Sequence, residues 1–416
     1  MNLFPNESAM QSWLEEELDN CGDLSDLIVN SDILDSFKPN TLEELRVIDS
    51  FKATHKALST NEIISTNSNI SLEKPDKLKP DLLLYGAESQ GVVAVELKNI
   101  PGPTREAGTE LGAYAAEIKT HIPFLSDGDL HNVIISNEWP TLLRHYVFHE
   151  IFWQQRNFIC LRPIKQGNRI RLEIVEIREL LEFNSAARIS ERHIAGYQLC
   201  LYDENLYEEP ENRSRLDPHI EQMKSALAVM SVEGNKLNSH GFAFLWKDHW
   251  ELSIAPYSIS IFNMAPFESI ERFLHEIEDL EDLTGFQRRL IELIKIQDPT
   301  GHGDSLHRIS ETGHSFLSTF CSPQYEGFSD WGALRYTMEG RAELLAFQGW
   351  GLFGDLFKDM LIQEYEAGNI NTPVTCPKLG LRVVEDMIDE NYQFIDPRHI
   401  LCDEEDDAEL FDDQIY

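Results

Sequence analysis

Two stretches decide the fold of the N-terminal half: Pro80-Asp81-Leu82-Leu83-Leu84-Tyr85-Gly86 and Gly91-Val92-Val93-Ala94-Val95-Glu96-Leu97-Lys98-Asn99. Both are short apolar runs that begin and end near glycine or proline, and the second is rich in β-branched valine, which predicts two strands. The segment between them, 86–91, has the size and composition of a hairpin loop. Because side chains alternate along a strand, Glu96 and Lys98 should point to one face and the valines around them to the other.

The predicted hairpin would bring Asp81, at the start of the first strand, beside Glu96. Two carboxylates with open positions suit Mg²⁺, which keeps several waters and is completed by a substrate phosphate. Lys98 would lie next to them, where it can orient an attacking water or stabilise developing negative charge. A structural interpretation stays open, in which Asp81 caps a turn and Glu96 and Lys98 form an ion pair at a strand end. Buried charges of this kind are costly to desolvate, so they need a partner or a purpose.

The elements around this hairpin predict a mixed α/β sandwich. Helices are expected at 7–20, from Thr41 to about Leu58, at 105–121 and from Pro140, the last opened by a residue that favours the first helical turn. Further strands are expected at 62–72, 132–136, 158–163 and 169–177. The resulting order is helix, three strands, helix, strand, helix, strand.

This order and these residues resemble the PD-(D/E)XK superfamily, the restriction-endonuclease-like nucleases, over residues 1–180. The motif reads Pro80-Asp81 followed by Glu96-Leu97-Lys98, and the predicted elements agree with the superfamily's αβββαβ core. The resemblance implies a Mg²⁺-dependent endonuclease with Asp81 and Glu96 as metal ligands and Lys98 as the catalytic cation. A nuclease fold that has lost its activity would also match, but all three residues are retained.

Two further matches extend the candidate site. Some branches of the superfamily carry Gln-x-x-x-Tyr in the helix after the motif, and this chain has Glu110 and Tyr114 at those positions, with glutamate replacing glutamine. Many members also place an acid on the first helix. Glu7 fits that position better than Glu44, and both are candidates.

Composition and cysteine usage are those of a globular protein without a disulfide framework. The six cysteines among 416 residues are scattered with no C-x-x-C pair, which favours a reducing, cytoplasmic setting. No run of apolar residues is long enough to span a membrane, and the first residues lack the features of a secretory signal. No membrane association is therefore expected.

The formal net charge of −37 is unusual for a protein that binds nucleic acid. Residues 1–200 carry 19 Lys and Arg against 30 Asp and Glu, whereas residues 201–416 carry 16 against 42, so most of the acidity belongs to the second half. The stretch 156–192 is locally basic, which favours a DNA contact there over a merely solvated sheet face by a small margin. DNA, if it is the substrate, should meet the first half.

The sequence predicts three parts: a nuclease-like domain at 1–180, an acidic domain of mixed α/β or α-rich structure at 190–400, and an acidic tail at 403–416. In the second part, strands are expected at 196–202 and 241–246, helices at 267–282 and 286–295, and mostly helix over 331–366. The tail, with eight acids in its first eleven residues, is expected to be disordered and solubilising. A tail that mimics DNA, or one that docks a basic partner, is the alternative.

Three other patterns are discounted. Gly349, Gly351 and Gly354 match G-x-G-x-x-G, but the residues before them are expected to be helical, whereas a dinucleotide site needs a strand there. A metal site at His302, Asp304, His307 and His314 is not expected, because histidines in a glycine-rich loop are more often solvated or capping groups. His145 and His149 are expected on an ordinary helix surface.

The expected function is Mg²⁺-dependent hydrolysis of DNA phosphodiester bonds, with Mn²⁺ able to substitute. The resemblance and the two-domain arrangement suggest an effector of restriction or bacterial anti-phage defence. Since the net charge implies weak DNA affinity, a protein partner or a homo-oligomer is expected to control activity. The rival hypothesis is a non-catalytic interaction protein with a nuclease-like fold, whose acidic surface binds a basic partner.

Overall fold

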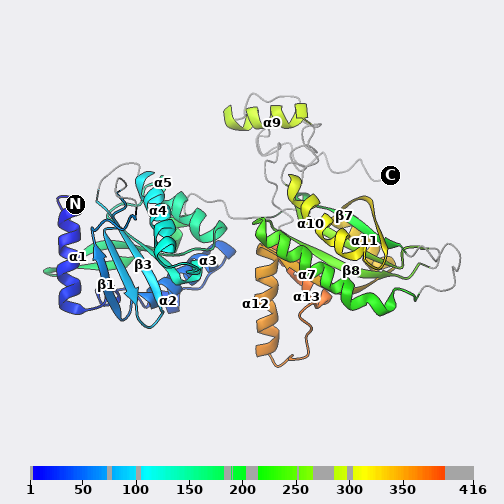
Figure 1. Cartoon of the computed structure of the whole chain (residues 1–416), viewed down its shortest axis with the longest axis horizontal. Coiled ribbons are helices and arrows are strands. Elements are labelled where there is room, and N and C mark those ends of the chain that lie inside the picture. The colour runs from blue at the N-terminus through cyan, green and yellow to red at the C-terminus, as the bar shows by residue number, and fades with distance from the viewer. Residues whose placement is uncertain are drawn as a thin grey trace, which may run out of the picture. The chain divides into compact units, whose positions relative to one another are not determined.

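The chain divides into two compact units, Met1–Ala187 and Arg188–Tyr416, and each is described by itself (Figure 1). The computed structural model describes residues 3–72, 77–99, 105–181, 189, 191–202, 214–250, 253–265, 285–297 and 303–388. Both units are mixed α/β and contain one sheet each. The helix expected at 267–282 and the tail at 403–416 lie outside the described residues.

Unit 1 is built on a six-stranded sheet whose strands lie side by side in chain order. They are β1 (Asn61–Thr66), β2 (Leu82–Gly86), β3 (Gly91–Lys98), β4 (Leu130–Ser136), β5 (Asn157–Gln166) and β6 (Arg169–Ile174). The central strands β3, β4 and β5 are parallel, and the outer pairs are antiparallel. The predicted hairpin is therefore present as β2–β3, with Leu82 opposite Val95. Strand β1 is shorter than the expected 62–72.

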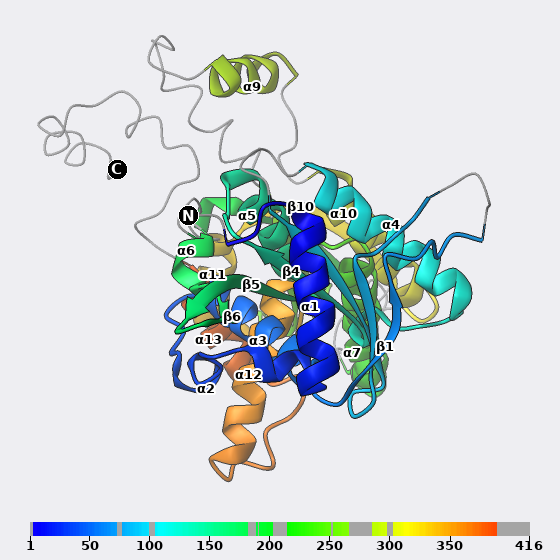
Figure 2. The same ribbon diagram turned by 90° about the vertical axis from the view of Figure 1, so that its left-hand side faces the viewer.

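Helices cover both faces of this sheet. Their bounds are α1 (Glu7–Cys21), α2 (Ile33–Ser36), α3 (Leu42–Ala57), α4 (Arg105–His121), α5 (Thr141–Phe148) and α6 (Ile177–Leu181), with short turns at Leu24–Leu27, Asp127–Asp129 and His149–Trp153. Thr41 caps α3 as expected, because its hydroxyl accepts the Glu44 N–H. Helix α1 runs along the sheet near β3 (Figure 2). Pro140 precedes α5 instead of occupying its first turn.

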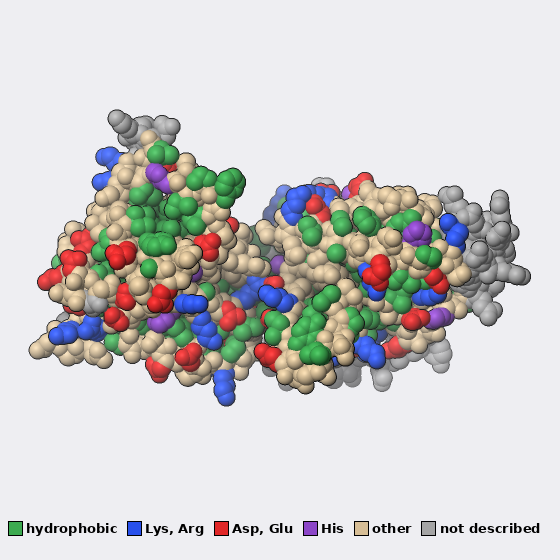
Figure 3. Space-filling model, turned by 60° about the horizontal axis from the view of Figure 1, so that its bottom comes forward, with side chains coloured by type: hydrophobic (Ala, Val, Ile, Leu, Met, Phe, Trp, Pro, Cys, Tyr) green, Lys and Arg blue, Asp and Glu red, His purple; other side chains and the backbone are tan. Residues whose placement is uncertain are grey.

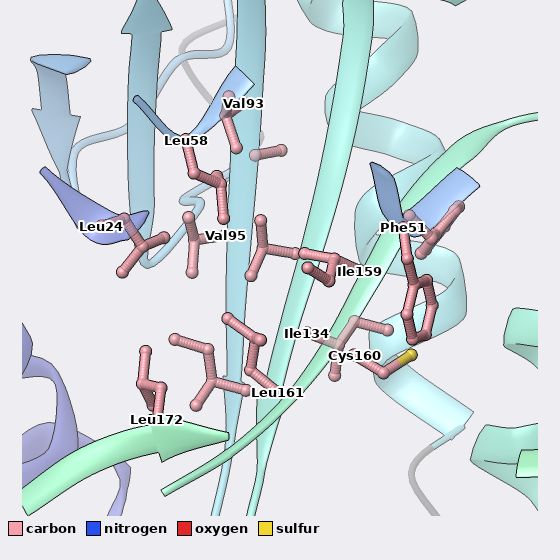
Figure 4. Close-up of a cluster of buried hydrophobic side chains, with 14 of the residues drawn as sticks. Leu24, Phe51, Leu58, Val93, Val95, Ile134, Ile159, Cys160, Leu161 and Leu172 are labelled. Carbon is pink, nitrogen blue, oxygen red and sulfur yellow. The ribbon is translucent and has the colours of Figure 1, made fainter. Parts of the chain in front are cut away.

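The core of unit 1 explains why β3 is so apolar. All eight of its residues are buried, as a strand covered on both faces requires. On one face Val93 and Val95 pack with Leu24, Phe51 and Leu58 from the surrounding helices (Figure 4). The opposite face meets α4, and Glu96 and Lys98 belong to that face because they alternate with Val95 and Leu97. The alternation of side chains along β3 therefore determines which face carries Glu96 and Lys98.

Unit 2 contains a five-stranded antiparallel sheet with the order β10-β7-β9-β8-β11. The strands are β7 (Ile194–Tyr202), β8 (Gly241–Asp248), β9 (Tyr257–Met264), β10 (Ser322–Asp330) and β11 (Ala342–Trp350), and the helices are α7 (Ile220–Lys236), α9 (Gly285–Gln297), α10 (Gly303–Leu317), α11 (Trp331–Gly340), α12 (Leu352–Glu366) and α13 (Pro377–Met387). Strands β7 to β10, with α7 and α10, follow the chain order of a split β-α-β unit. Strand β11 then extends the sheet beside β8.

Two hydrophobic clusters separate the faces of this second sheet. One joins α7 and α10 to the side of the sheet that presents Leu245 and Ile259. The other joins α11, α12 and α13 to the opposite side, which presents Phe242, Phe244 and Phe262. Unit 2 is therefore a three-layer α/β/α unit with an antiparallel sheet.

The helix expected before Gly349 is wrong, because residues 342–350 form β11 and pair with β8 along its whole length. The glycine pattern therefore does lie between a strand and a helix. Its amides are nevertheless occupied: the Gly351 N–H donates to Asn235 Oδ1 (2.9 Å) and the Leu352 N–H to His240 Nδ1 (3.3 Å). A Cβ on Gly349 would lie 2.9 Å from the Gly354 nitrogen, so these glycines permit close packing of α12 on β11. The pattern is structural, although the reason differs from the expected one.

None of the described helices combines the length and hydrophobicity that a membrane span needs.

Candidate functional site

The candidate site lies where β2 begins and β3 ends, on the face of the sheet covered by α4. Asp81 immediately precedes β2. Glu96 and Lys98 lie at the C-terminal end of β3, two residues apart and therefore on the same face of the strand. Leu82 is paired with Val95, so Asp81 extends the same register towards Glu96. The structure thus brings the three motif residues to one place, as the hairpin predicted.

Lys98 lies between two carboxylates. Its Nζ donates to Glu96 Oε1 at 2.6 Å and to Glu110 Oε2, from α4, at 3.0 Å. Burial alone would lower the pKa of this ammonium, but the attraction and hydrogen bonds of Glu96 and Glu110 outweigh it, so the pKa of Lys98 is raised. Lys98 is therefore a permanently charged group at this site, and it does not serve as a base near neutral pH.

Asp81 is held by the backbone of its neighbour strand. Its Oδ2 accepts the Leu97 N–H at 2.8 Å. The pKa of Asp81 is raised to about 6: burial is the main cause and the charges of Glu7 and Glu110 add to it, while the Leu97 hydrogen bond and Lys98 act in the opposite direction. The carboxylate is thus fixed in position but disfavoured in its charged form.

The pKa of Glu96 is raised more than that of Asp81. Burial is the main cause, and repulsion by Asp81 the next, of a pKa raised to about 9, despite the opposing ion pair with Lys98. Only Oε1 is bonded. Among the described residues, the buried Oε2 has no hydrogen-bond partner. A buried oxygen without a partner costs free energy and needs an explanation such as a cation.

The other candidate acids separate into two groups. Glu7 and Glu110 join the motif residues: Glu7 Oε1 accepts the Asn99 N–H at 3.2 Å, and Glu110 bonds Lys98. Glu44 does not, because it lies in the first turn of α3, where it pairs with Arg178 at 3.0 Å. Between the two helix acids, the geometry therefore favours Glu7.

Tyr114 lies one turn after Glu110 on α4 and is buried. Its hydroxyl donates to the carbonyl of Lys79 at 3.0 Å, two residues before Asp81. Burial, and then the negative charges of Glu96 and its neighbours, raise the pKa of Tyr114, so the phenol stays protonated. The hydrogen bond from Tyr114 to the Lys79 carbonyl fixes the backbone that leads into Asp81.

The donor set fits a divalent cation. Lys98 is a single ammonium among four acids, Glu7, Asp81, Glu96 and Glu110, whose charges act on one another. Hard carboxylate oxygens of this kind suit Mg²⁺ or Mn²⁺, and Glu96 Oε2 is an oxygen without another partner. In the described part of the chain, no group of three or more His, Cys, Asp or Glu side chains could hold a metal ion. A cation at this site would therefore have at most a pair of these acids as ligands and would not be enclosed by protein.

Two residues that the sequence analysis missed hold the site together. Gln11, one helical turn after Glu7, donates from Nε2 to the Asp81 carbonyl at 3.2 Å. Asn99 is buried, and its Nδ2 donates to the Phe4 carbonyl at 3.0 Å while its N–H binds Glu7. The i, i+4 spacing of Glu7 and Gln11 was a usable signal, because it places both on one helix face. The role of Asn99 depends on tertiary contacts.

Half of the cations in the basic stretch expected to contact DNA are paired within unit 1. Four of its arginines pair with nearby acids: Arg156 with Glu150, Arg162 with Glu173 and Glu179, Arg171 with Glu17, and Arg178 with Glu44. On the face of this unit drawn in Figure 3, acidic and basic side chains are interspersed. These pairs weaken the case for a DNA contact along 156–192, where Lys165 and Arg169 are the exposed cations without an ion pair among the described residues.

The discounted histidines do not form a site. Asp304, His307 and His314 lie on α10, so the expected glycine-rich loop is wrong for them, and His302 lies outside the described residues. His307 pairs with Glu311 at 3.2 Å, and His314 bonds the carbonyl of Pro323 at 3.0 Å. His145 and His149 are exposed at the end of α5 and the start of the following turn.

No family model, curated protein or solved structure matches this chain. What can be said of its function therefore depends on the geometry of the site and on the motif.

Proposed function

We propose that unit 1 is a Mg²⁺-dependent endonuclease that hydrolyses DNA phosphodiester bonds. The observation that carries the proposal is the excess of acids around the buried Lys98, and above all the unbonded Oε2 of the buried Glu96. A purely structural ion pair would need one acid for Lys98. Here Glu96 and Glu110 both accept hydrogen bonds from the Lys98 ammonium. Asp81 adds a third carboxyl group, and its surroundings raise its pKa. Perturbed carboxylates of this kind are typical of functional sites.

In the proposed reaction, Asp81 and Glu96 would hold the metal, and Mn²⁺ could take the place of Mg²⁺. The bound ion would supply Lewis-acid polarisation of the phosphate and a lower pKa for water. Lys98 keeps its proton, so it acts by electrostatic stabilisation of the developing negative charge and by orienting the attacking water. Glu110 holds the Lys98 ammonium in place, and Glu7, through Asn99, ties α1 to the end of β3.

Unit 2 has a different proposed role. We assign it to target recognition, sensing or assembly, because it contributes no catalytic motif and most of the negative charge. A nuclease with such a partner domain suits an effector of restriction or anti-phage defence, kept inactive until the protein assembles or meets its signal. The rival function, a non-catalytic module that binds a basic partner, makes the opposite prediction for metal-dependent cleavage.

The test compares the wild type with Asp81→Asn on supercoiled plasmid in Mg²⁺, Mn²⁺ or EDTA. We expect nicking in either metal, none in EDTA, and a loss of at least about 100-fold in Asp81→Asn, because a ligand and its charge are removed. Asp19→Asn, an exposed acid of α1, is the matched control and should retain activity.

Metal binding is measured separately by the thermal unfolding midpoint. Mg²⁺ should raise the midpoint of the wild type and of Asp19→Asn, and it should leave that of Asp81→Asn nearly unchanged. If the wild type neither cleaves plasmid nor responds to either metal, the nuclease proposal fails and the interaction module is favoured.

A further inference from the structure

The segment that leads into Asp81 carries two exposed cations beside the candidate site. Exposure alternates along it: Lys77 and Lys79 are exposed, whereas Leu78 is half-buried against the core of unit 1 and Pro80 is buried. Alternate residues of an extended chain point to the same side and lie roughly 6.6 Å apart. Lys77 and Lys79 therefore form a short row that ends next to the residue proposed to hold the metal.

This segment is fixed at several points. The Leu78 N–H donates to Asn69 Oδ1 at 2.8 Å, and the Leu78 carbonyl accepts the Ile70 N–H at 2.9 Å. Tyr114 of the candidate site binds the Lys79 carbonyl at 3.0 Å. The backbone between Lys77 and Asp81 is therefore held against both the core and α4. The Cα positions from which the two lysine side chains extend are thus fixed.

The two lysines differ from most arginines of the basic stretch. Four of the five arginines in 156–178 form ion pairs, with Glu150, Glu173, Glu179, Glu17 and Glu44, and the fifth, Arg169, is the first residue of β6, an edge strand that is not beside β2. Within the described residues, neither Lys77 nor Lys79 forms an ion pair. An ammonium that is not neutralised is available to a phosphate, and each such contact releases counterions from nucleic acid.

We propose that Lys77 and Lys79 contact successive phosphates of the nucleic-acid strand that enters the site at Asp81. This inference rests on the proposed nuclease function and moves the nucleic-acid contact from 156–192 to the segment 77–81. The lysines position the backbone without reading the base sequence, because point charges on phosphates carry no sequence information. The strand would therefore pass Lys77 and Lys79 before it reaches Asp81 and Glu96.

The test measures binding of a labelled DNA duplex and of a labelled single strand in EDTA, where cleavage cannot occur, over a range of low salt concentrations. The double variant Lys77→Gln/Lys79→Gln is compared with Lys52→Gln/Lys56→Gln, which removes two exposed lysines of α3 and the same net charge. The magnitude of the slope of log K against log salt should fall in the first variant by about 1.8 for the duplex, about 0.9 for each lost contact, and by about 1.4 for the single strand. It should fall by much less in the second variant.

Two results overturn the proposal: equal slopes for the two double variants, or no binding of either DNA by the wild type at the lowest salt. A failure of the nuclease function is separate from these, because Asp81→Asn should lose cleavage and keep the wild-type salt slope. Metal-dependent cleavage with unchanged binding in Lys77→Gln/Lys79→Gln would overturn only the lysine assignment. A normal slope difference without cleavage would overturn only the nuclease.

Discussion

At the end of β3 in unit 1, the buried side chains of Glu96 and Lys98 are ionisable, and Glu110 shares the Lys98 ammonium. On β8, β9 and β11 of unit 2, the buried side chains of Trp246, Ser260, Asn263 and Trp350 are neutral and paired. In unit 2, Trp246 Nε1 donates to Ser260 Oγ and Trp350 Nε1 to Asn263 Oδ1, each at 3.1 Å. In unit 1, Glu96 has one bonded oxygen and one without a partner. A satisfied neutral network stabilises a fold, and an unsatisfied charged one costs stability unless something binds.

This contrast indicates where function should be sought when no comparison with a known protein points to it. The core of unit 2 is explained by packing and by hydrogen bonds that it makes itself. The end of β3 is not explained in that way, because its acids outnumber its cation. We therefore expect matched substitutions in the two units to change the free energy of unfolding by different amounts, and in one case with opposite sign.

The largest effect is expected from the two lysines that pair with acids. Lys98→Ala leaves the buried Glu96 without its cation, and the partly exposed Glu110 loses the same partner, which should lower the free energy of unfolding by about 3 kcal/mol. Lys247→Ala, in unit 2, breaks a half-exposed pair with Asp217 and should cost about 1 kcal/mol or less. Urea unfolding measures both, and hydrogen exchange of the β3 and β9 amides assigns each loss to its unit. Equal losses would contradict the contrast between the units.

A smaller effect should appear when pH is lowered, and it belongs to unit 2. Burial lowers the pKa of His193 to about 4, against an ordinary value of 6.5. The folded state therefore favours the neutral ring, so this stability is present in full above pH 6.5 and is lost as the pH falls towards 4. Between about pH 7 and 5 the loss should reach about 2 kcal/mol.

His193→Gln removes that titration, so its free energy of unfolding should fall less than that of the wild type over the same interval. Parallel curves for wild type and His193→Gln would show that His193 is not the group responsible.

Sequence patterns predicted the strands of unit 1 correctly where the local strand signals agree with the burial of the residues. The valine-rich run of β3 and its glycine boundaries predicted the hairpin, the buried strand and the face that carries Glu96 and Lys98. They failed at β11, where Ala342-Glu343-Leu344-Leu345-Ala346 has a strong helix propensity and pairing with β8 overrides it. They also missed β9, although Tyr257, Ile259 and Ile261 alternate as strand residues do.

The candidate site shows the same limit. Spacing along β3 predicted that Asp81, Glu96 and Lys98 would meet, because a hairpin needs only local geometry. It did not show that Glu110 bonds Lys98, or that Asn99 connects Glu7 to the end of the strand. Those contacts join α1 and α4 to β3, and the sequence does not specify such distances between elements.

The smallest expected effect has the opposite sign to the first. Burial and nearby acids raise the pKa of Asp81 to about 6 from 3.8, so the folded state favours the protonated carboxyl. The stability linked to protonation is present below about pH 4 and is lost as the pH rises through 6. In EDTA at pH 8 the shift alone would make Asp81→Asn more stable than the wild type by about 3 kcal/mol. The neutral amide accepts the Leu97 N–H more weakly than the carboxylate does, so a net gain of about 1 kcal/mol is expected, with no gain at pH 4. The amide can still accept the Leu97 N–H, so the bond that positions β2 is kept.

Asp217→Asn is the matched substitution in unit 2. Asp217 accepts hydrogen bonds from Tyr257 and Lys247, so its loss should destabilise the protein by about 1 kcal/mol. Urea unfolding in EDTA at the two pH values decides the matter. If both substitutions destabilise at pH 8, the acids of unit 1 are held as favourably as those of unit 2. The excess charge at the end of β3 would then no longer indicate a metal site.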